Sequence, residues 1–399
     1  MPAFDPPDFY QIDELLSPDE RRIRDTVREW VQRRFEPVVV QHHRDGTFPL
    51  ELAPELGELG VFGPTLSGYG CAGVSNVATG LIMQELERSD SGLRTFASVQ
   101  GSLAMMAIDL FGSDEQKEQW LPALAKGTKL GSFALTEPDF GSNPAGMQTR
   151  ARKTADGYVL NGAKRWIGNA TVADVVIVWA KVQDDAGADP ESASAVRGFL
   201  VEKGTPGFEP RLIEGKLSLR VGLTAEIGFA DCVLPSTAVL PQSRGLRSPL
   251  ECLNHARFGI SWGVIGAAMA CYEEARQHAM QRIQFGRPIG SFQLVQAKLA
   301  RMLTEITKAQ LLALRVAQLK DAGAAKHYQI SMAKMNNVAM ALEIARTARD
   351  LLGANGILDS HATFRHMCNL ESVKTYEGTE DIHLLVLGQQ ITGIPAFAS

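Results

Sequence analysis

Glu377, Gly378 and Thr379 combine a carboxylate with backbone features that could place it in a cleft. Thr379 is a typical helix N-cap, and the acidic Glu380 and Asp381 after it favour a first helical turn. Gly378 lets the backbone approach a ligand closely, so Glu377 is expected on a loop directly before a helix. A carboxylate shielded from water can act as a general base. On the residues alone, a glutamate on a surface loop is the ordinary alternative.

Arg94 is a second residue with chemical potential, at the end of segment 87–94 (ERSDSGLR). A guanidinium pairs with a carboxylate through two parallel hydrogen bonds. If it is buried, it also penalises uncharged ligands, which would leave its charge unpaired. A solvated arginine at a helix end is the alternative. Arg94 therefore suggests an anion-recognising pocket only if other residues enclose it.

The composition sets limits on the kind of protein that carries these residues. The chain has 399 residues, of which 45% are hydrophobic and 21% charged, so two or three globular domains are expected. A net charge of -5 argues against nucleic acid or an anionic membrane as the main partner. The ends of the sequence resemble neither targeting nor lipidation signals, and no segment has the roughly 18 apolar residues of a membrane span. A cytoplasmic enzyme is expected.

Cysteine and histidine spacing indicates no special chemistry. The five cysteines are far apart, odd in number and without a CxxC pair, which predicts reduced structural thiols. The eight histidines show no HExxH or zinc-finger spacing. No metal site is predicted.

The residue pattern changes from helix-type to strand-type and back to helix-type along the chain, which predicts three domains. Residues 1–130 form a helical domain whose first long helix has an N-cap at Ser17, and the glycine-rich segment 67–73 is a loop. Residues 131–245 read as a small antiparallel sheet domain. Residues 246–399 are predicted to form a helix bundle. The fold class is mainly α with a central β domain.

Finer patterns support these assignments. The β-branched run 175–179 (VVIVW) and the run 198–201 (GFLV) predict strands, and the polar segment 184–190 predicts a turn between them. An apolar seam with a/d spacing predicts a helix that packs in the bundle core or at a subunit interface: Val295, Leu299, Met302, Ile306, Ala309, Ala313 and Val316. No G-x-G-x-x-G is present, so a flavin would bind without a Rossmann fold.

Four segments resemble the acyl-CoA dehydrogenase family in order and spacing, and the resemblance is greatest to its glutaryl-CoA branch. They are 133–138 (FALTEP) with 141–142 (GS), 161–167 (NGAKRWI), 282–289 (RIQFGRPI) and 376–379 (YEGT). The resemblance covers nearly the whole chain. It implies a C-terminal four-helix bundle, FAD as cofactor, an electron-transferring flavoprotein as acceptor, a homotetramer, and Glu377 as the base that removes the α-proton.

The resemblance also implies the residues that bind FAD. Trp166 would pack against the flavin ring, where a rigid aromatic suits the role, and Arg282 and Gln293 would reach the FAD of a neighbouring subunit. The full set is Phe133, Leu135, Thr136, Gly141, Ser142, Trp166, Ile167, Gly168, Arg282, Phe285, Gln293, Asp350, Leu351, Gly353, Asn355 and Thr379.

The acyl pocket follows from the same resemblance. Arg94 would hold the distal carboxylate of a glutaryl chain, with Glu87 as its partner and Tyr376 beside it. The implied substrate-binding set is Glu87, Arg94, Thr95, Ser98, Ser142, Asn254, Arg257, Tyr376 and Gly378. The expected reaction is oxidative decarboxylation of glutaryl-CoA to crotonyl-CoA and CO2, as in lysine and tryptophan catabolism.

Two positions depart from the family pattern. Gly168 stands where a hydroxyl residue usually lies near the flavin, and some related acyl-CoA oxidases share this sequence. Asn143 stands where Asp is common. A short-chain acyl-CoA dehydrogenase or oxidase without decarboxylation is therefore kept as an alternative, and a non-catalytic acyl-CoA-binding protein as a distant one.

Overall fold

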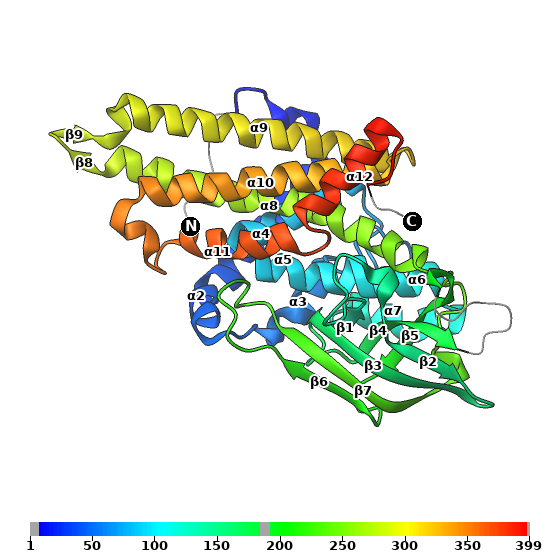
Figure 1. Ribbon diagram of the computed structural model, residues 1–399. Coiled ribbons are helices and arrows are strands. Elements are labelled where there is room, and N and C mark those ends of the chain that lie inside the picture. The colour runs from blue at the N-terminus through cyan, green and yellow to red at the C-terminus, as the bar shows by residue number, and fades with distance from the viewer. Residues whose placement is uncertain (1–7, 184–191, 397–399) are drawn as a thin grey trace.

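The computed structural model describes residues 8–183 and 192–396. The predicted turn at 184–190 lies outside the described residues. Helices flank a central sheet domain in the chain order, as expected (Figure 1). The helices are α1 (Pro18–Trp30), α2 (Glu36–Asp45), α3 (Ala53–Glu58), α4 (Asn76–Ser89), α5 (Ser91–Ser98), α6 (Met106–Phe111), α7 (Asp114–Ala125), α8 (Arg247–Gln281), α9 (Gln293–Asp321), α10 (His327–Leu351), α11 (Ala362–Thr375) and α12 (Glu380–Thr392).

The first long helix begins as the sequence predicts. The Ser17 hydroxyl accepts a hydrogen bond from the Glu20 amide at 3.2 Å, and the Glu20 carboxylate accepts one from the Ser17 amide at 2.8 Å. This reciprocal capping box satisfies two amides that a helix end leaves unpaired. The glycine-rich segment 67–73 contains neither helix nor strand, also as predicted.

The strands are β1 (Gly131–Ala134), β2 (Arg150–Lys153), β3 (Gly157–Gly168), β4 (Val175–Gln183), β5 (Val196–Glu202), β6 (Phe208–Leu212), β7 (Thr224–Pro235), β8 (Ile283–Gln284) and β9 (Arg287–Pro288). The first seven form one sheet, in the order β1-β4-β2-β3-β7-β6 with β5 also on β4. The predicted strands at 175–179 and 198–201 lie in β4 and β5. The antiparallel sheet expected from the sequence is found for the pairs β2–β3, β3–β7, β4–β5 and β6–β7, whereas β1 and β2 both pair with β4 in parallel. Parallel pairing needs long connections, which local sequence patterns do not reveal.

The C-terminal helices form the expected bundle. In Figure 1 the long helices α8, α9 and α10 run side by side, with α11 against them and α12 at one end. The a/d seam of α9 faces the core of this chain: Met302, Ile306, Ala309, Ala313 and Val316 are buried, and Val295 and Leu299 are partly buried. Core packing is therefore the correct interpretation of the seam.

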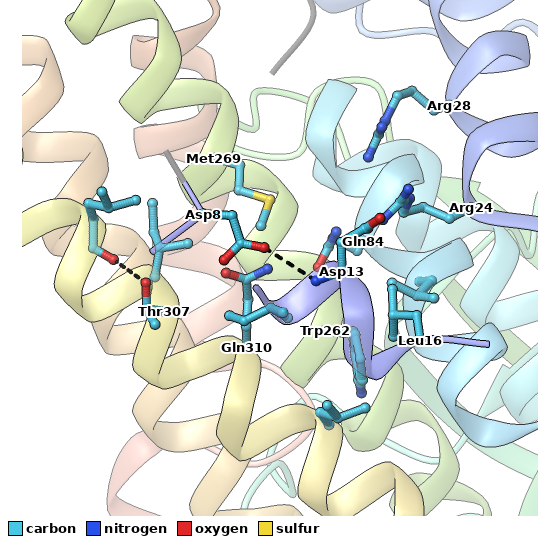
Figure 2. Close-up of a pocket in the computed structure, with 15 residues that line it drawn as sticks. Asp8, Asp13, Leu16, Arg24, Arg28, Gln84, Trp262, Met269, Thr307 and Gln310 are labelled. Atoms are coloured by element: carbon cyan, nitrogen blue, oxygen red, sulfur yellow. Dashed lines mark hydrogen bonds and ion pairs between the residues drawn. The ribbon is translucent and has the colours of Figure 1, made fainter. Parts of the chain in front are cut away.

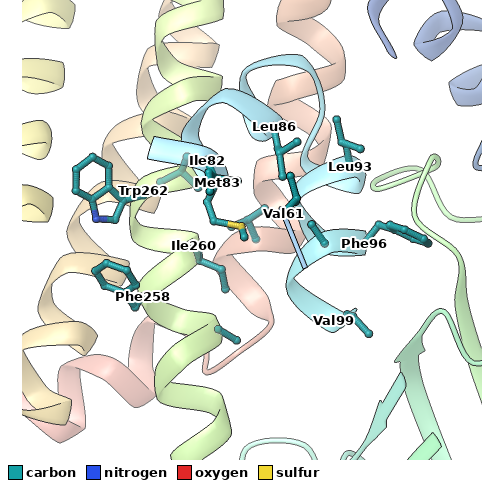
Figure 3. Packing of buried hydrophobic residues seen from close by; sticks show 14 of the residues in the cluster. Val61, Ile82, Met83, Leu86, Leu93, Phe96, Val99, Phe258, Ile260 and Trp262 are labelled. Carbon is teal, nitrogen blue, oxygen red and sulfur yellow. The ribbon is translucent and has the colours of Figure 1, made fainter. Parts of the chain in front are cut away.

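The N-terminal helices pack directly on the bundle, so that one core spans both. Figure 3 shows Met83 and Leu86 of α4, Phe96 of α5 and Ile260 of α8 in a single packed cluster. Gly266 allows this close approach, because a Cβ there would lie 1.9 Å from the carbonyl oxygen of Gln84. None of the helices in the described residues is both long and apolar enough to cross a membrane.

Candidate active site

Glu377 lies in the short loop between α11 and α12. Thr379 caps α12, because its hydroxyl accepts a hydrogen bond from the Ile382 amide at 3.3 Å. The predicted helix start is thus confirmed. The two residues before the cap have left-handed backbone angles, with φ of 58° at Glu377 and 91° at Gly378. A Cβ on Gly378 would lie 2.9 Å from Nε2 of the buried His383, so a side chain would not fit there.

The Glu377 carboxylate has the environment of a base. Its Oε2 atom is buried and has no hydrogen-bond partner among the described residues. Burial raises the pKa of Glu377, and the charges of Arg257, Lys334 and Arg94 act in the opposite direction. A carboxylate with a raised pKa and an unused oxygen can accept a proton from a bound molecule.

Two cations hold this loop by its carbonyl groups. Arg257 of α8 donates from Nε to the carbonyl oxygen of Glu377 at 2.8 Å. Lys334 of α10 donates from Nζ to the carbonyl oxygens of Tyr376, at 3.0 Å, and Gly378, at 2.8 Å. Contacts to the loop were not indicated for either residue by the sequence, and the substrate contact predicted for Arg257 stays a prediction. Asn254, one turn earlier on α8, is half-buried.

Beside the loop lies a polar cluster of the buried Glu87 and Arg94 with the half-buried Thr95 and Tyr376. Arg94 donates from Nε to Glu87 at 2.6 Å and from Nη2 to the Tyr376 hydroxyl, which lies 3.3 Å from the Thr95 hydroxyl. The side chains of Arg94 and Glu87 are 1% and 0% exposed, so Arg94 is not a solvated helix-end residue. Burial opposes the charge on Arg94, but Glu87 and Tyr376 outweigh it and raise the Arg94 pKa.

A helix break at Asp90 brings this cluster together. Asp90 ends α4 and caps α5, and its Oδ1 atom accepts the Gly92 amide at 2.6 Å. Its other oxygen accepts hydrogen bonds at 3.0 Å from Arg365 and from Asn369 of α11. The chain therefore leaves α4 and begins α5 at Asp90, and Arg94 of α5 pairs with Glu87 of α4. Ser98, also predicted for the pocket, is buried on α5 directly before a π-helical segment, Val99–Met105.

Gly263 of α8 leaves the space that this ion pair needs. A Cβ at Gly263 would lie 2.1 Å from Oε2 of Glu87 and 3.2 Å from Cγ of Arg94. We expect Gly263→Ala to displace the pair and to lower stability by about 1–3 kcal/mol, the usual cost of overpacking a core. Thermal unfolding would show a lowered melting temperature.

Gly259→Ala, one turn earlier on the same helix, is the matched control. A Cβ there would make an ordinary contact of 3.4 Å with Met83. Alanine also favours a helix over glycine by about 0.5–1 kcal/mol, so this variant should be as stable as the wild type or more so. A melting temperature for Gly263→Ala at or above that of Gly259→Ala would contradict the crowding.

The first two motifs lie side by side in the sheet. Thr136 accepts a hydrogen bond at its carbonyl oxygen from the Arg165 amide at 2.9 Å. The buried Lys164 donates to Glu137 and to the carbonyl oxygen of Leu135, both at 2.9 Å. Burial lowers the pKa of Lys164 to about 8, against the charge of Glu137. This pair lies within the quoted motifs, but no role had been predicted for it.

Among the predicted flavin contacts, Phe133, Leu135 and Ile167 are buried, and Gly141 and Ser142 are exposed.

Trp166 is presented to solvent by an irregularity in β3. The register shifts between Lys164 and Ile167, where two residues of β3, Arg165 and Trp166, stand opposite one residue of β7, Glu226. Trp166 has a φ of 63°, and 56% of it is exposed. A bulge of this kind re-aims a side chain and is common beside functional sites. A large exposed indole on a rigid strand is a suitable surface for a planar ring.

Gly168, the last residue of β3, lies where this strand packs against the helical segment after Ser98. Its carbonyl oxygen accepts a hydrogen bond from the Ser132 hydroxyl at 2.6 Å. A Cβ at Gly168 would lie 3.0 Å from Cγ2 of Val99, the residue after Ser98. The end of β3, two residues after Trp166, therefore lies against the π-helical segment that directly follows the helix carrying Arg94.

The remaining predicted cofactor residues lie at the other end of the bundle. Arg282 and the 93%-exposed Phe285 belong to the β8–β9 hairpin, which projects beyond α8 and α9 (Figure 1). Gln293, Gly353 and Asn355 are also exposed, Asp350 is paired with Lys298, and Leu351 is buried. Arg257, which contacts the Glu377 loop, and Arg282 are separated by most of the length of α8, a distance of about 37 Å at 1.5 Å per residue. Within one chain, the residues around Arg282 therefore lie far from the Glu377 loop.

A cavity of about 280 Å³ lies apart from the Glu377 loop, between the N-terminal segment and helices α1, α4, α8 and α9. Figure 2 shows Asp8, Asp13 and Gln310 around it. None of the residues predicted for substrate or cofactor lines it. The polar geometry around Glu377, rather than this cavity, marks the candidate active site.

Comparisons with known proteins agree with this geometry. Three family profiles match in order: "Acyl-CoA dehydrogenase, N-terminal domain" at residues 17–128, "Acyl-CoA dehydrogenase, middle domain" at 132–232 and "Acyl-CoA dehydrogenase, C-terminal domain" at 243–392. A short-chain specific acyl-CoA dehydrogenase of Clostridium acetobutylicum is 30% identical over 95% of this chain and 100% of its own.

Two solved structures are more similar. A glutaryl-CoA dehydrogenase from Mycobacterium smegmatis is 52% identical over 97% of this chain and 98% of its own, with a TM-score of 0.93. A glutaryl-CoA dehydrogenase from the same organism, in complex with FADH2, is 48% identical over 98% of both chains, with a TM-score of 0.94. Family profiles, a curated relative and solved structures thus agree over nearly the whole length, and the chain belongs to the acyl-CoA dehydrogenase family.

Proposed function

We propose that this acyl-CoA dehydrogenase uses FAD to oxidise glutaryl-CoA and releases crotonyl-CoA and CO2. The observation that carries the proposal is the buried guanidinium of Arg94 beside the loop of Glu377. Its hydrogen bonds to described residues use Nε and Nη2, so Nη1 is the arm left for a substrate carboxylate. The relatedness to two glutaryl-CoA dehydrogenases at about 50% identity supports the same substrate.

The residues present fit a flavin between the sheet and the pocket. The exposed indole of Trp166 offers a flat apolar surface. Oε2 of Glu377, which has no hydrogen-bond partner within 8–183 and 192–396, offers a base. Phe133, Leu135, Thr136 and the backbone of Gly168 lie on adjoining segments and would hold the ring. When bound, FAD would supply the acceptor for a hydride from the β-carbon of the substrate.

The chain's own residues would supply the proton chemistry. Glu377 would take the α-proton from the thioester, which is acidic enough only if the developing negative charge on the carbonyl oxygen is stabilised. Arg94 would hold the distal carboxylate and thereby fix the chain in line with Glu377. After dehydrogenation, that carboxylate could leave as CO2, because its electrons delocalise into the thioester, and protonation would give crotonyl-CoA.

We further propose a homotetramer with shared cofactor sites. The exposure of Arg282, Phe285 and Gln293, far along α8 from Trp166, supports a contact to the FAD of a neighbouring subunit. An arginine suits a pyrophosphate because its planar fork pairs with phosphate oxygens. By family resemblance, an electron-transferring flavoprotein would accept the electrons.

Anaerobic mixing of the purified protein with glutaryl-CoA tests the proposal. We expect the flavin absorbance to bleach and CO2 to be released. Bleaching without CO2 would leave a dehydrogenase that does not decarboxylate. Bleaching with butyryl-CoA but not with glutaryl-CoA would identify a short-chain enzyme. A purified protein without flavin would support the alternative of a non-catalytic acyl-CoA-binding protein.

An oxidase is the second candidate, because Gly168 lacks the usual hydroxyl. Its contact with Val99 leaves little room for a side chain at this position. After reduction by substrate, admitting dioxygen would distinguish the two. Reoxidation of the flavin by dioxygen as fast as its reduction by substrate would favour the oxidase. Much slower reoxidation would favour the dehydrogenase.

A further inference from the structure

The loop of Glu377 is held at three consecutive carbonyl groups. Lys334 donates to those of Tyr376 and Gly378 at 3.0 and 2.8 Å, and Arg257 donates to the one between them at 2.8 Å. The two cations come from different helices, α10 and α8. The loop is therefore clamped from two sides, and Lys334 makes two of the three contacts.

The conformation that these contacts hold is unusual. A glutamate rarely adopts a positive φ because its Cβ crowds the backbone, yet Glu377 has a φ of 58° and Gly378 one of 91°. Such a conformation persists only where the surroundings enforce it. It also decides where the Glu377 carboxylate points, because φ sets the direction of the Cα–Cβ bond.

Lys334 occupies a position where a lysine is costly. It is 1% exposed and lies on the buried face of α10, with Ile330 and Val338 one turn to either side. Burial lowers the pKa of Lys334 to about 7, and the charge of Glu377 acts against this effect. A buried amine needs fixed partners, and the partners it has are the loop carbonyl groups.

We propose that Lys334 is a positioning residue for proton abstraction, which aims the Glu377 carboxylate at the substrate by fixing the carbonyl oxygens of Tyr376 and Gly378. The inference rests on the proposed role of Glu377 as the base. Arg257 and His383 flank the same loop and complete its surroundings. Lys334 itself does not transfer the proton.

Lys334→Met and Lys334→Gln, with Asn337→Leu as control, test this role. Asn337 is buried on the same helix, but its amide bonds to the Ser261 carbonyl at 2.8 Å and not to the loop. In Lys334→Met we expect single-turnover flavin reduction to slow about 100-fold, the effect of a misplaced reacting group, with nearly unchanged substrate affinity. The amide of Lys334→Gln keeps two N–H donors and should restore part of the rate.

Two further measurements separate positioning from stability. The kinetic isotope effect with α-deuterated glutaryl-CoA should increase in Lys334→Met, and its crystal structure should show Glu377 out of the left-handed region. Asn337→Leu should lower the melting temperature and leave rate and isotope effect unchanged. A wild-type rate in Lys334→Met, or an equal loss of rate in Asn337→Leu, would overturn the proposal. Absence of flavin reduction in the wild type would instead refute the proposed function.

Discussion

Glu377→Gln is expected to bind FAD normally and to reduce it about 10⁴-fold more slowly with glutaryl-CoA, the upper range for general-base catalysis. Glutamine has nearly the same shape as glutamate, so the loop and its clamp by Arg257 and Lys334 should remain. Its amide, however, cannot accept the α-proton. Stopped-flow absorbance of the flavin measures the rate, and the ratio of flavin to protein checks that the cofactor is retained.

Glu380→Gln makes the same chemical change three residues away. Glu380 lies in the first turn of α12, where its partly exposed side chain pairs with Lys374 at 2.7 Å. This control should reduce its flavin at the wild-type rate. Normal reduction in Glu377→Gln would mean that the base is a different residue.

The pH dependence of the wild type follows from the same burial. Because burial raises the pKa of Glu377, the carboxylate should become protonated at a pH above the ordinary range of glutamates. A protonated carboxyl group cannot accept the α-proton, so the reduction rate should fall as the pH falls through this raised pKa. A rate that stays constant down to the ordinary glutamate range, near pH 4, would contradict the raised value.

Removing Arg94 is expected to change which acyl-CoA the protein uses. Arg94→Met alone would leave the buried charge of Glu87 unpaired, which is strongly destabilising, so we propose the double variant Arg94→Met with Glu87→Gln. It should lose about 1000-fold in kcat/KM with glutaryl-CoA, within the range for losing a buried charge contact. With butyryl-CoA, which has no distal carboxylate, it should lose little.

Glu87→Gln alone is the companion control. It keeps the guanidinium of Arg94, so a preference for glutaryl-CoA over butyryl-CoA should persist. If the double variant loses activity equally with both substrates, Arg94 supports the structure of the pocket and does not recognise the carboxylate. That result would leave the base assignment untouched, because Glu377 is tested separately.

Several features of the fold and site could be predicted from the sequence because their causes are local. The N-caps at Ser17 and Thr379 depend on residues within three positions, and the seam along α9 depends on helical periodicity. The order of helices, sheet and helices follows from residue patterns that change from helix-type to strand-type and back at the domain boundaries. The motif around Glu377 was recognisable because its residues are adjacent in the chain.

What only the tertiary structure decided are contacts between distant residues. Arg94 meets Tyr376 across 282 positions, and Lys334 reaches the Glu377 loop across more than 40. The one signal for Lys334 was a charged residue on an apolar helical face, which does not name its partner. The parallel pairing of β1 and β2 with β4 is likewise invisible locally. Burial explains why these contacts could not be predicted from local sequence. The pKa and partners of a charged group, and the pairing of a strand edge, depend on the residues that surround it, and these come from elements far apart in the chain.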